Sequence, residues 1–149
     1  MPLNETPSTV QWPETHYVFL EKVGPFMQTA PAAWGDVHKL VPAISEKCEI
    51  TGYMSLYKVG PQIYRAGVAV ATAPVAVPEG LQYEKFPGGK YSRFVLTGSY
   101  AQLGEASGRA FQLASQLPLR EGFNIENYVN DPRITPVDDL VTEILFPID

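Results

Sequence analysis

Hydrophobic positions along the chain alternate with polar ones in short stretches and recur every three or four residues in two longer stretches. Alternation places successive side chains on opposite faces of a strand, whereas the longer period places them on one side of a helix. The longer period predicts helices over about residues 29–46 and 103–117. The alternating stretches predict strands over residues 16–23, 49–59, 63–72, 81–86, 90–97, 124–131 and 140–148.

The order strand–helix–strand–strand occurs twice, in repeats that cover residues 16–72 and 81–148. When the repeats are aligned, Gly24 matches Gly98 and Gln28 matches Gln102. This order predicts an α+β fold with a duplicated βαββ unit, pseudo-two-fold symmetry and two helices packed on one face of an antiparallel sheet. The cleft between the halves is then the natural place for a ligand.

The first 15 residues hold three prolines and several small polar residues, and we expect them to form an N-terminal arm or an irregular edge segment. They have no basic start and no apolar core, so a signal peptide is not expected. They are also too short for a helix-turn-helix. No stretch of about 20 apolar residues predicts a membrane span. The sequence therefore predicts one cytoplasmic domain over residues 16–149, preceded by the arm.

Charge and cysteine content limit the kinds of partner and the compartment that are expected for the chain. The 149 residues carry a net charge of −5, and no basic run is present. Such a chain is a poor candidate for contact with phosphate backbones, so direct nucleic-acid binding is not expected. Cys48 is the only cysteine, which excludes an internal disulfide and is typical of a reducing compartment.

Common catalytic and cofactor motifs are missing from the sequence. No phosphate-binding glycine loop and no G-x-S-x-G nucleophile elbow occurs. His16 and His38 are the only histidines, and neither has a partner at metal-ligand spacing. We therefore expect neither a cofactor nor a metal site.

A carboxylate within the apolar last strand is the first candidate for a functional group. Glu143 stands in the stretch LVTEILFPI, between hydrophobic neighbours. A buried carboxylate is costly unless it is protonated or has a partner. Glu126 and Tyr128 share one face of the strand at 124–131. If the face that carries Glu126 and Tyr128 coincides with the face that carries Glu143, the two acids lie at the floor of one cleft. Such a cleft suits a flat, apolar cation.

Two tyrosines of the strand at 49–59 are the candidate walls of that cleft. Tyr53 and Tyr57 lie on one face, while Met54 and Leu56 lie on the other and are expected to point toward the helix.

Each candidate also has a purely structural interpretation. The two tyrosines of the strand at 49–59 could fill the core. Glu126 could pair with Arg133. Glu143 could bond to Arg65 or to a tyrosine hydroxyl.

Two segments of the C-terminal half carry a family resemblance. They are FPGGKYSRFVLTGSY, at residues 86–100, and ENYVNDPRITPVDDLVTEILFPI, at residues 126–148. Together they resemble the GyrI-like small-molecule-binding family, which includes the effector-binding domains of multidrug-responsive and AraC-type transcription activators of bacteria. The resemblance covers most of residues 16–148, and Gly24-Pro25-Phe26 is the part that the first repeat contributes.

The resemblance implies a duplicated βαββ fold with a pocket between its halves. It makes Glu143 the expected pocket acid and places Glu126 and Tyr128 on the family's E-x-Y positions. Because the first 15 residues cannot hold a DNA-binding region, the chain is expected to be a stand-alone member.

Three functions follow from this resemblance. The leading hypothesis is a stand-alone protein that binds aromatic or lipophilic, cationic compounds through Glu143, Glu126, Tyr128, Tyr53 and Tyr57. The alternative is a hydrolase of cyclopropane-bearing DNA-alkylating toxins, with Glu143 and Tyr128 as catalytic residues. The second alternative is a gyrase-inhibitor-like protein-interaction module. A homodimer is possible in each case.

Overall fold

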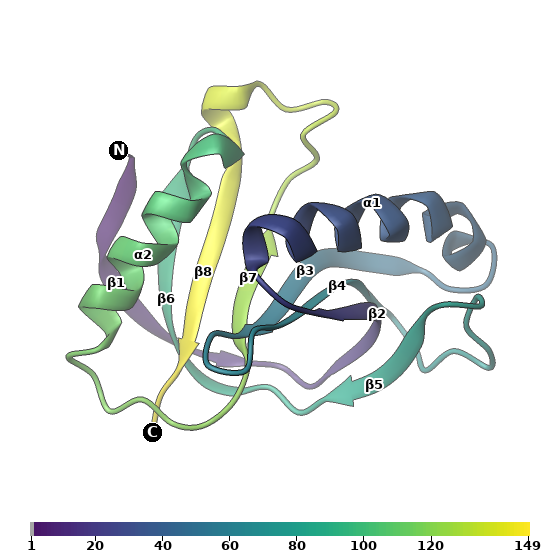
Figure 1. Cartoon of the computed structure of the whole chain (residues 1–149), viewed down its shortest axis with the longest axis horizontal. Coiled ribbons are helices and arrows are strands. Elements are labelled where there is room, and N and C mark those ends of the chain that lie inside the picture. Colours follow the sequence, from purple (N-terminus) through teal and green to yellow (C-terminus); the bar gives the residue numbers. More distant parts are fainter. Residues whose placement is uncertain (1) are drawn as a thin grey trace. The chain divides into compact units, whose positions relative to one another are not determined.

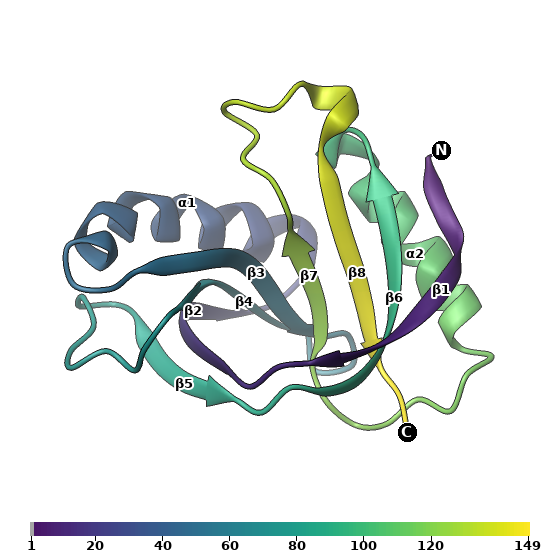
Figure 2. The ribbon, with the colours of Figure 1, turned by 180° about the vertical axis from the view of Figure 1, so that it is seen from behind.

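A computed structural model describes residues 2–149, so Met1 of the predicted arm lies outside the described residues. The chain divides into two compact units. Unit 1 consists of the chain up to Trp12 together with Gly89–Asp149, and unit 2 consists of Pro13–Gly88. Within residues 2–149 the structure has eight strands and two α-helices, and the strands within each unit are antiparallel (Figures 1 and 2).

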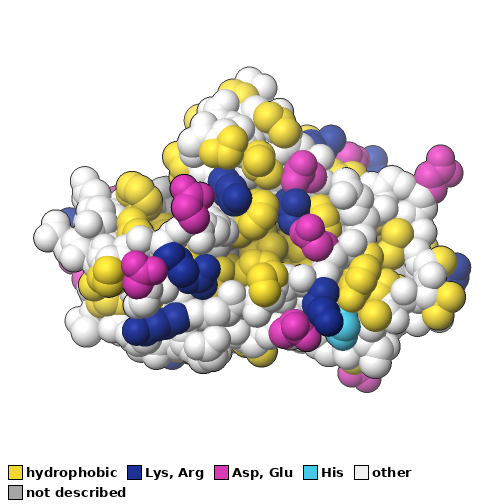
Figure 3. Space-filling model, turned by 90° about the horizontal axis from the view of Figure 1, so that it is seen from below, with side chains coloured by type: hydrophobic (Ala, Val, Ile, Leu, Met, Phe, Trp, Pro, Cys, Tyr) yellow, Lys and Arg dark blue, Asp and Glu magenta, His cyan; other side chains and the backbone are white. Residues whose placement is uncertain are grey.

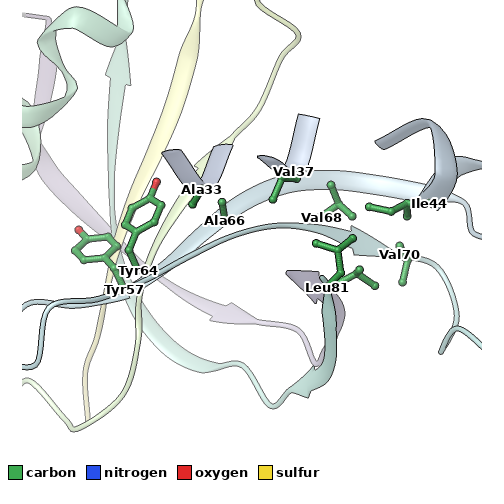
Figure 4. Packing of buried hydrophobic residues seen from close by; sticks show 10 residues of the cluster. Ala33, Val37, Ile44, Tyr57, Tyr64, Ala66, Val68, Val70 and Leu81 are labelled. Carbon is green, nitrogen blue, oxygen red and sulfur yellow. The ribbon is translucent and has the colours of Figure 1, made fainter. Parts of the chain in front are cut away.

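Unit 2 contains one helix and four strands. These elements are β2 (Thr15–Val23), α1 (Phe26–Ser45), β3 (Ile50–Lys58), β4 (Ile63–Val70) and β5 (Gln82–Phe86). The strand order is β3-β4-β2-β5. Figure 4 shows α1 laying Ala33, Val37 and Ile44 against Val68 and Val70 of β4. Burying this apolar stripe of α1 removes hydrocarbon surface from water and fixes the helix on its sheet.

Unit 1 also contains one α-helix and four strands. They are β1 (Leu3–Trp12), β6 (Gly89–Thr97), α2 (Leu103–Ala114), β7 (Asn124–Tyr128) and β8 (Val141–Pro147), with 3-10 turns at Tyr100–Gln102 and Val137–Asp139. The strand order is β1-β6-β8-β7. Three buried alanines of α2 allow the helix to approach two phenylalanines of the sheet closely. The residues of this contact are Ala106, Ala110, Ala114, Phe94 and Phe146.

The two units share one topology, which confirms the predicted α+β fold and the duplication. In each unit a strand, a helix and two strands follow one another along the chain, and the third strand lies between the first and the second. The fourth strand of each unit pairs with the first. In sequence this fourth strand precedes the first strand of the other unit, so β1 leads into β2 and β5 leads into β6.

Several element bounds differ from the prediction. Residues 3–12, expected as an arm or an irregular edge segment, form β1, whose register shifts once between Asn4 and Ser8. Helix α1 begins at Phe26 and continues past Pro42 to Ser45. Strand β7 ends at Tyr128 because the Asn130 side chain bonds the loop instead, donating to the Asp139 carbonyl and accepting from the Val141 amide.

Charged side chains of opposite sign lie next to one another on the surface shown in Figure 3. Pairs of this kind include Lys22 with Asp36 and Arg109 with Glu5. Exposed pairs contribute little to stability but neutralise charge locally. Among residues 2–149, no helix is long and apolar enough to cross a membrane.

Candidate functional site

Glu143 lies on the face of the unit 1 sheet that is turned away from α2. Its cross-strand neighbours are Val95 of β6 and Asn127 of β7. Arg93 Nη1 donates to one carboxylate oxygen at 3.1 Å, and Asn127 Nδ2 donates to the other at 2.8 Å. Its partners are therefore an arginine and an amide of unit 1, rather than Arg65 or a tyrosine hydroxyl.

Glu126 lies on the opposite face, beneath α2. It stands directly across from Ile144, which packs in the core with the alanines of α2. Ser107 Oγ of α2 donates to one carboxylate oxygen at 3.0 Å, and the Tyr128 hydroxyl donates to the other at 3.1 Å. Both partners are neutral, and no ion pair to Glu126 occurs among residues 2–149. The predicted partner Arg133 pairs instead with Asp131, at 2.8 Å.

Burial raises the pKa of the Glu126 carboxyl above its usual value, and the two hydroxyl hydrogen bonds act in the opposite direction. Water is a better environment for a carboxylate than apolar side chains and two hydroxyl donors. The ionised form is therefore destabilised at this position. A carboxyl of this kind is suited to receive a positive charge or to exchange a proton.

We expect this raised pKa to make stability fall as the pH rises. Above the ordinary carboxyl pKa of 4.5, the unfolded chain has lost the proton that folded Glu126 still holds. The stabilisation present at low pH is then lost as the pH rises through the folded pKa. Urea unfolding between about pH 4.5 and 7 measures this slope, and Glu126→Gln should reduce it. The control Glu105→Gln removes an exposed carboxylate from α2 and should leave the slope unchanged; an identical slope in Glu126→Gln would contradict the prediction.

Two tyrosine rings stand beside Glu126. The rings of Tyr128 and Tyr100 meet edge to face, with their centroids 5.7 Å apart. Tyr100 begins the turn that leads into α2, and the Ser99 side chain caps this turn by accepting a hydrogen bond from the Ala101 amide. Tyr100 was not among the predicted site residues. Tyr100 closes the segment FPGGKYSRFVLTGSY that carries the family resemblance, and this was the signal that could have indicated it.

Glu143 does not share a face of the sheet with Glu126 and Tyr128, although we expected this from the sequence. Tyr128 is paired with Thr142, and Glu126 with Ile144, so both lie on the α2 side of the sheet. Glu143 is the residue between those two positions of β8 and points to the other side. The hypothesis that Glu143 and Tyr128 act together on one substrate atom is therefore wrong for this geometry.

In unit 2 the predicted orientation of β3 is wrong. Tyr53 and Tyr57 pair across from Val68 and Tyr64, which face α1, so the tyrosine face is the helix face. Met54 and Leu56 lie on the far side of the sheet, where the buried Tyr17 hydroxyl donates to the Met54 carbonyl. Polar atoms are tolerated on the face of the unit 2 sheet that α1 covers, because the hydroxyl groups there have hydrogen-bond partners.

The helix face of unit 2 holds a network of aromatic and hydroxyl groups. Trp34 Nε1 donates to the Tyr64 hydroxyl at 2.9 Å and to Ser55 Oγ at 3.2 Å. The Tyr53 ring stacks at 6.2 Å from His38 and stands 6.5 Å from Trp34. Tyr57 is buried against Phe26. It therefore fills the core, which is the structural interpretation that the sequence also allowed.

A shallow hollow of about 570 Å³ lies along α2 and β1 of unit 1. Its lining consists of Glu5, Gly104, Glu105, Gly108, Arg109 and Gln112, and none of the predicted site residues is among them. Among residues 2–149, no group of three or more potential ligands could hold a metal ion.

The sequence matches the GyrI-like small molecule binding domain over residues 5–149. The chain belongs to the GyrI-like family. This GyrI-like domain is thus a small-molecule-binding domain, as the motifs of its C-terminal half indicated. No curated protein matches its sequence.

Solved structures share the GyrI-like fold at low sequence identity. The EcmrR C-terminal domain is 17% identical with a TM-score of 0.75, covering 97% of each chain. SAV2435 bound to tetraphenylphosphonium is 12% identical with a TM-score of 0.72, covering 97% of this chain and 94% of that one. A hydrolase from Listeria innocua is 11% identical with a TM-score of 0.63, covering 98% and 93%. At these identities the likeness shows the fold.

Proposed function

We propose that this GyrI-like domain binds an aromatic or lipophilic cation and that Glu126 supplies the counter-charge. The observation that carries the proposal is the environment of the Glu126 carboxylate. It lies beneath α2 with two hydroxyl donors, Ser107 and Tyr128, and without a cationic partner in residues 2–149. A cation placed beside it would supply the charge that this carboxylate lacks.

The neighbouring rings support an apolar, positively charged ligand. The faces of tyrosine rings attract cations and offer apolar contact area at the same time. Tyr128 and Tyr100 provide two such rings next to Glu126. Tyr53 belongs to unit 2 and is no part of the site proposed here, which lies within unit 1. Glu143 is proposed as a structural residue, because its carboxylate already has Arg93 as counter-charge.

Tetraphenylphosphonium is the probe that tests this proposal, because a protein of the same fold is known with it bound. We expect Glu126→Gln to weaken its binding by at least about tenfold, since the amide keeps the shape but loses the charge. Titration calorimetry or tyrosine and tryptophan fluorescence measures the dissociation constant.

Glu143→Gln is the matched control for this experiment. It also replaces a partly buried glutamate of unit 1, but one on the other face of the sheet. We expect it to change the affinity by less than about twofold, well under 1 kcal/mol. An affinity that survives Glu126→Gln and falls in Glu143→Gln would overturn the assignment.

A hydrolase is the second candidate, and the bond between Tyr128 and Glu126 favours it. The two groups are 3.1 Å apart, and the pKa of the acid is raised by burial, as general acid–base catalysis requires. In the opening of an activated cyclopropane, the water oxygen would bond to a ring carbon while the ring C–C bond breaks and its electron pair moves onto the adjacent carbonyl as an enolate. Ionised Glu126 would take the proton that the water loses. The Tyr128 hydroxyl would stabilise the charge that develops on the carbonyl oxygen of the substrate. Turnover of such an electrophile, lost in Glu126→Gln and Tyr128→Phe, tests this candidate. Absence of turnover in the wild type rejects it.

A further inference from the structure

Three buried hydroxyl groups of unit 1 have no hydrogen-bond partner among residues 2–149. They are Ser92 Oγ, on β6, the Tyr100 hydroxyl, at the turn before α2, and Thr142 Oγ1, on β8. The Thr142 side chain is completely buried. Buried polar groups of folded proteins almost always have partners, so hydroxyls of this kind need an explanation.

Two of the three hydroxyls, those of Tyr100 and Thr142, belong to residues that adjoin Tyr128. Ser92 stands across from Phe146 instead. Thr142 stands directly across from Tyr128 in the pairing of β7 with β8, a position that brings side chains within about 5.5 Å. The Tyr100 ring packs against the Tyr128 ring. Tyr128 in turn donates to Glu126. The hydroxyls of Tyr100 and Thr142 therefore lie beside the proposed charge site and on the same side of the sheet.

Each of these hydroxyls is available as a donor. Burial and the negative charge of Asp131 raise the pKa of the Tyr100 hydroxyl, which therefore keeps its proton at neutral pH. A donor that is already buried loses no further contact with water when a ligand arrives. An acceptor atom on the ligand would then gain a hydrogen bond at little cost in desolvation.

We infer that the ligand of this site carries a hydrogen-bond acceptor, such as a carbonyl or ether oxygen, in addition to its positive charge. Tyr100 is the donor that selects for it, and Thr142 is a second donor beside the same ring. This inference rests on the proposed function, because it names the class of ligand that the Glu126 site takes. A cation built only of hydrocarbon groups would satisfy Glu126 and leave the Tyr100 hydroxyl unpaired.

Two phosphonium cations that differ only in one acceptor test this inference. They are (4-phenylbutyl)triphenylphosphonium and (3-benzoylpropyl)triphenylphosphonium, in which a ketone replaces one methylene group. We expect the ketone to bind about tenfold more tightly to the wild type, since it pairs a buried donor that otherwise has no partner. Tyr100→Phe keeps the aromatic ring, removes only the hydroxyl, and should bring the ratio of the two affinities to about one.

Three further measurements separate the possible failures. Tyr83→Phe removes a hydroxyl that bonds to His16 in unit 2, and it should retain the preference for the ketone. Tyr100→Phe should not lower the urea midpoint, because the hydroxyl it removes has no partner to lose. Glu126→Gln should weaken both cations and keep their ratio.

Equal affinity of the two cations for the wild type, or a preference that survives Tyr100→Phe, would overturn the inference. Unchanged affinity of both cations in Glu126→Gln would instead overturn the proposed function. In that case the ratio of the two cations' affinities, compared between the wild type and Tyr100→Phe, would still show whether the ketone oxygen pairs with the Tyr100 hydroxyl.

Discussion

Gly67→Ala is expected to destabilise the protein by at least about 3 kcal/mol. Gly67 lies on β4, opposite Phe19 of β2. An added Cβ would meet the backbone carbonyl oxygen of Val18, and it would lie 2.8 Å from both Phe19 Cβ and Tyr17 Cε1. Because the nearest of these atoms belongs to the backbone, a rotamer change cannot relieve the contact. The strands would have to move apart.

Gly52→Ala is the matched control for this prediction. Gly52 lies on the neighbouring strand β3, and an added Cβ there meets nothing within 4 Å. We expect a change in unfolding free energy below about 0.5 kcal/mol in urea denaturation. Equal effects of the two substitutions would contradict the close approach of β2 and β4 at Gly67.

Arg93→Ala has the second largest expected effect, a loss of about 2 kcal/mol of stability. It leaves the Glu143 carboxylate with Asn127 as its remaining hydrogen-bond donor. The Arg93 side chain is 37% exposed and that of Glu143 is 16% exposed. Water can therefore reach part of the site, and the loss should be smaller than for a completely buried pair.

A double-mutant cycle distinguishes the ion pair from the packing of the arginine stem. If the charge of Glu143 causes the loss, Arg93→Ala should cost less when Glu143→Gln is already present. Arg109→Ala is the comparison, because it breaks an exposed pair with Glu5 and should cost under about 1 kcal/mol. Equal costs for Arg93→Ala in both backgrounds would show that Glu143 does not need its counter-charge.

The fold could be predicted from the sequence because each element carries its own local signal. The period of Ala106, Ala110 and Ala114 shows one face of α2, and Pro87-Gly88-Gly89 marks the turn before β6. The first strand could not be predicted as well. Pro7 and the polar residues around it weaken its alternation, and β1 is held mainly by its pairing with β6, which lies far away in the sequence.

The candidate site was only partly predictable for a different reason. Alternation shows that Glu126 and Tyr128 share a face, but it does not show which face the helix covers. That choice depends on the pairing of β7 with β8, which places Asn127, rather than Glu126, opposite Glu143. The same limit applies to β3, where the tyrosines and not Met54 and Leu56 face α1. The Arg93 partner of Glu143 comes from β6, so no local pattern indicates it.

The proposed function requires that the carboxylate beneath α2, and not the one on the opposite face of the sheet, meets the cation. Carbon-13 NMR of the glutamate side-chain carboxyls, recorded as a pH titration with and without tetraphenylphosphonium, tests it most directly. A nearby positive charge favours the ionised form of an acid, so we expect the ligand to lower the pKa of Glu126 and to leave the position of the Glu143 carboxyl resonance unchanged. A ligand that moves the Glu143 carboxyl resonance and leaves the pKa of Glu126 unchanged would contradict this assignment.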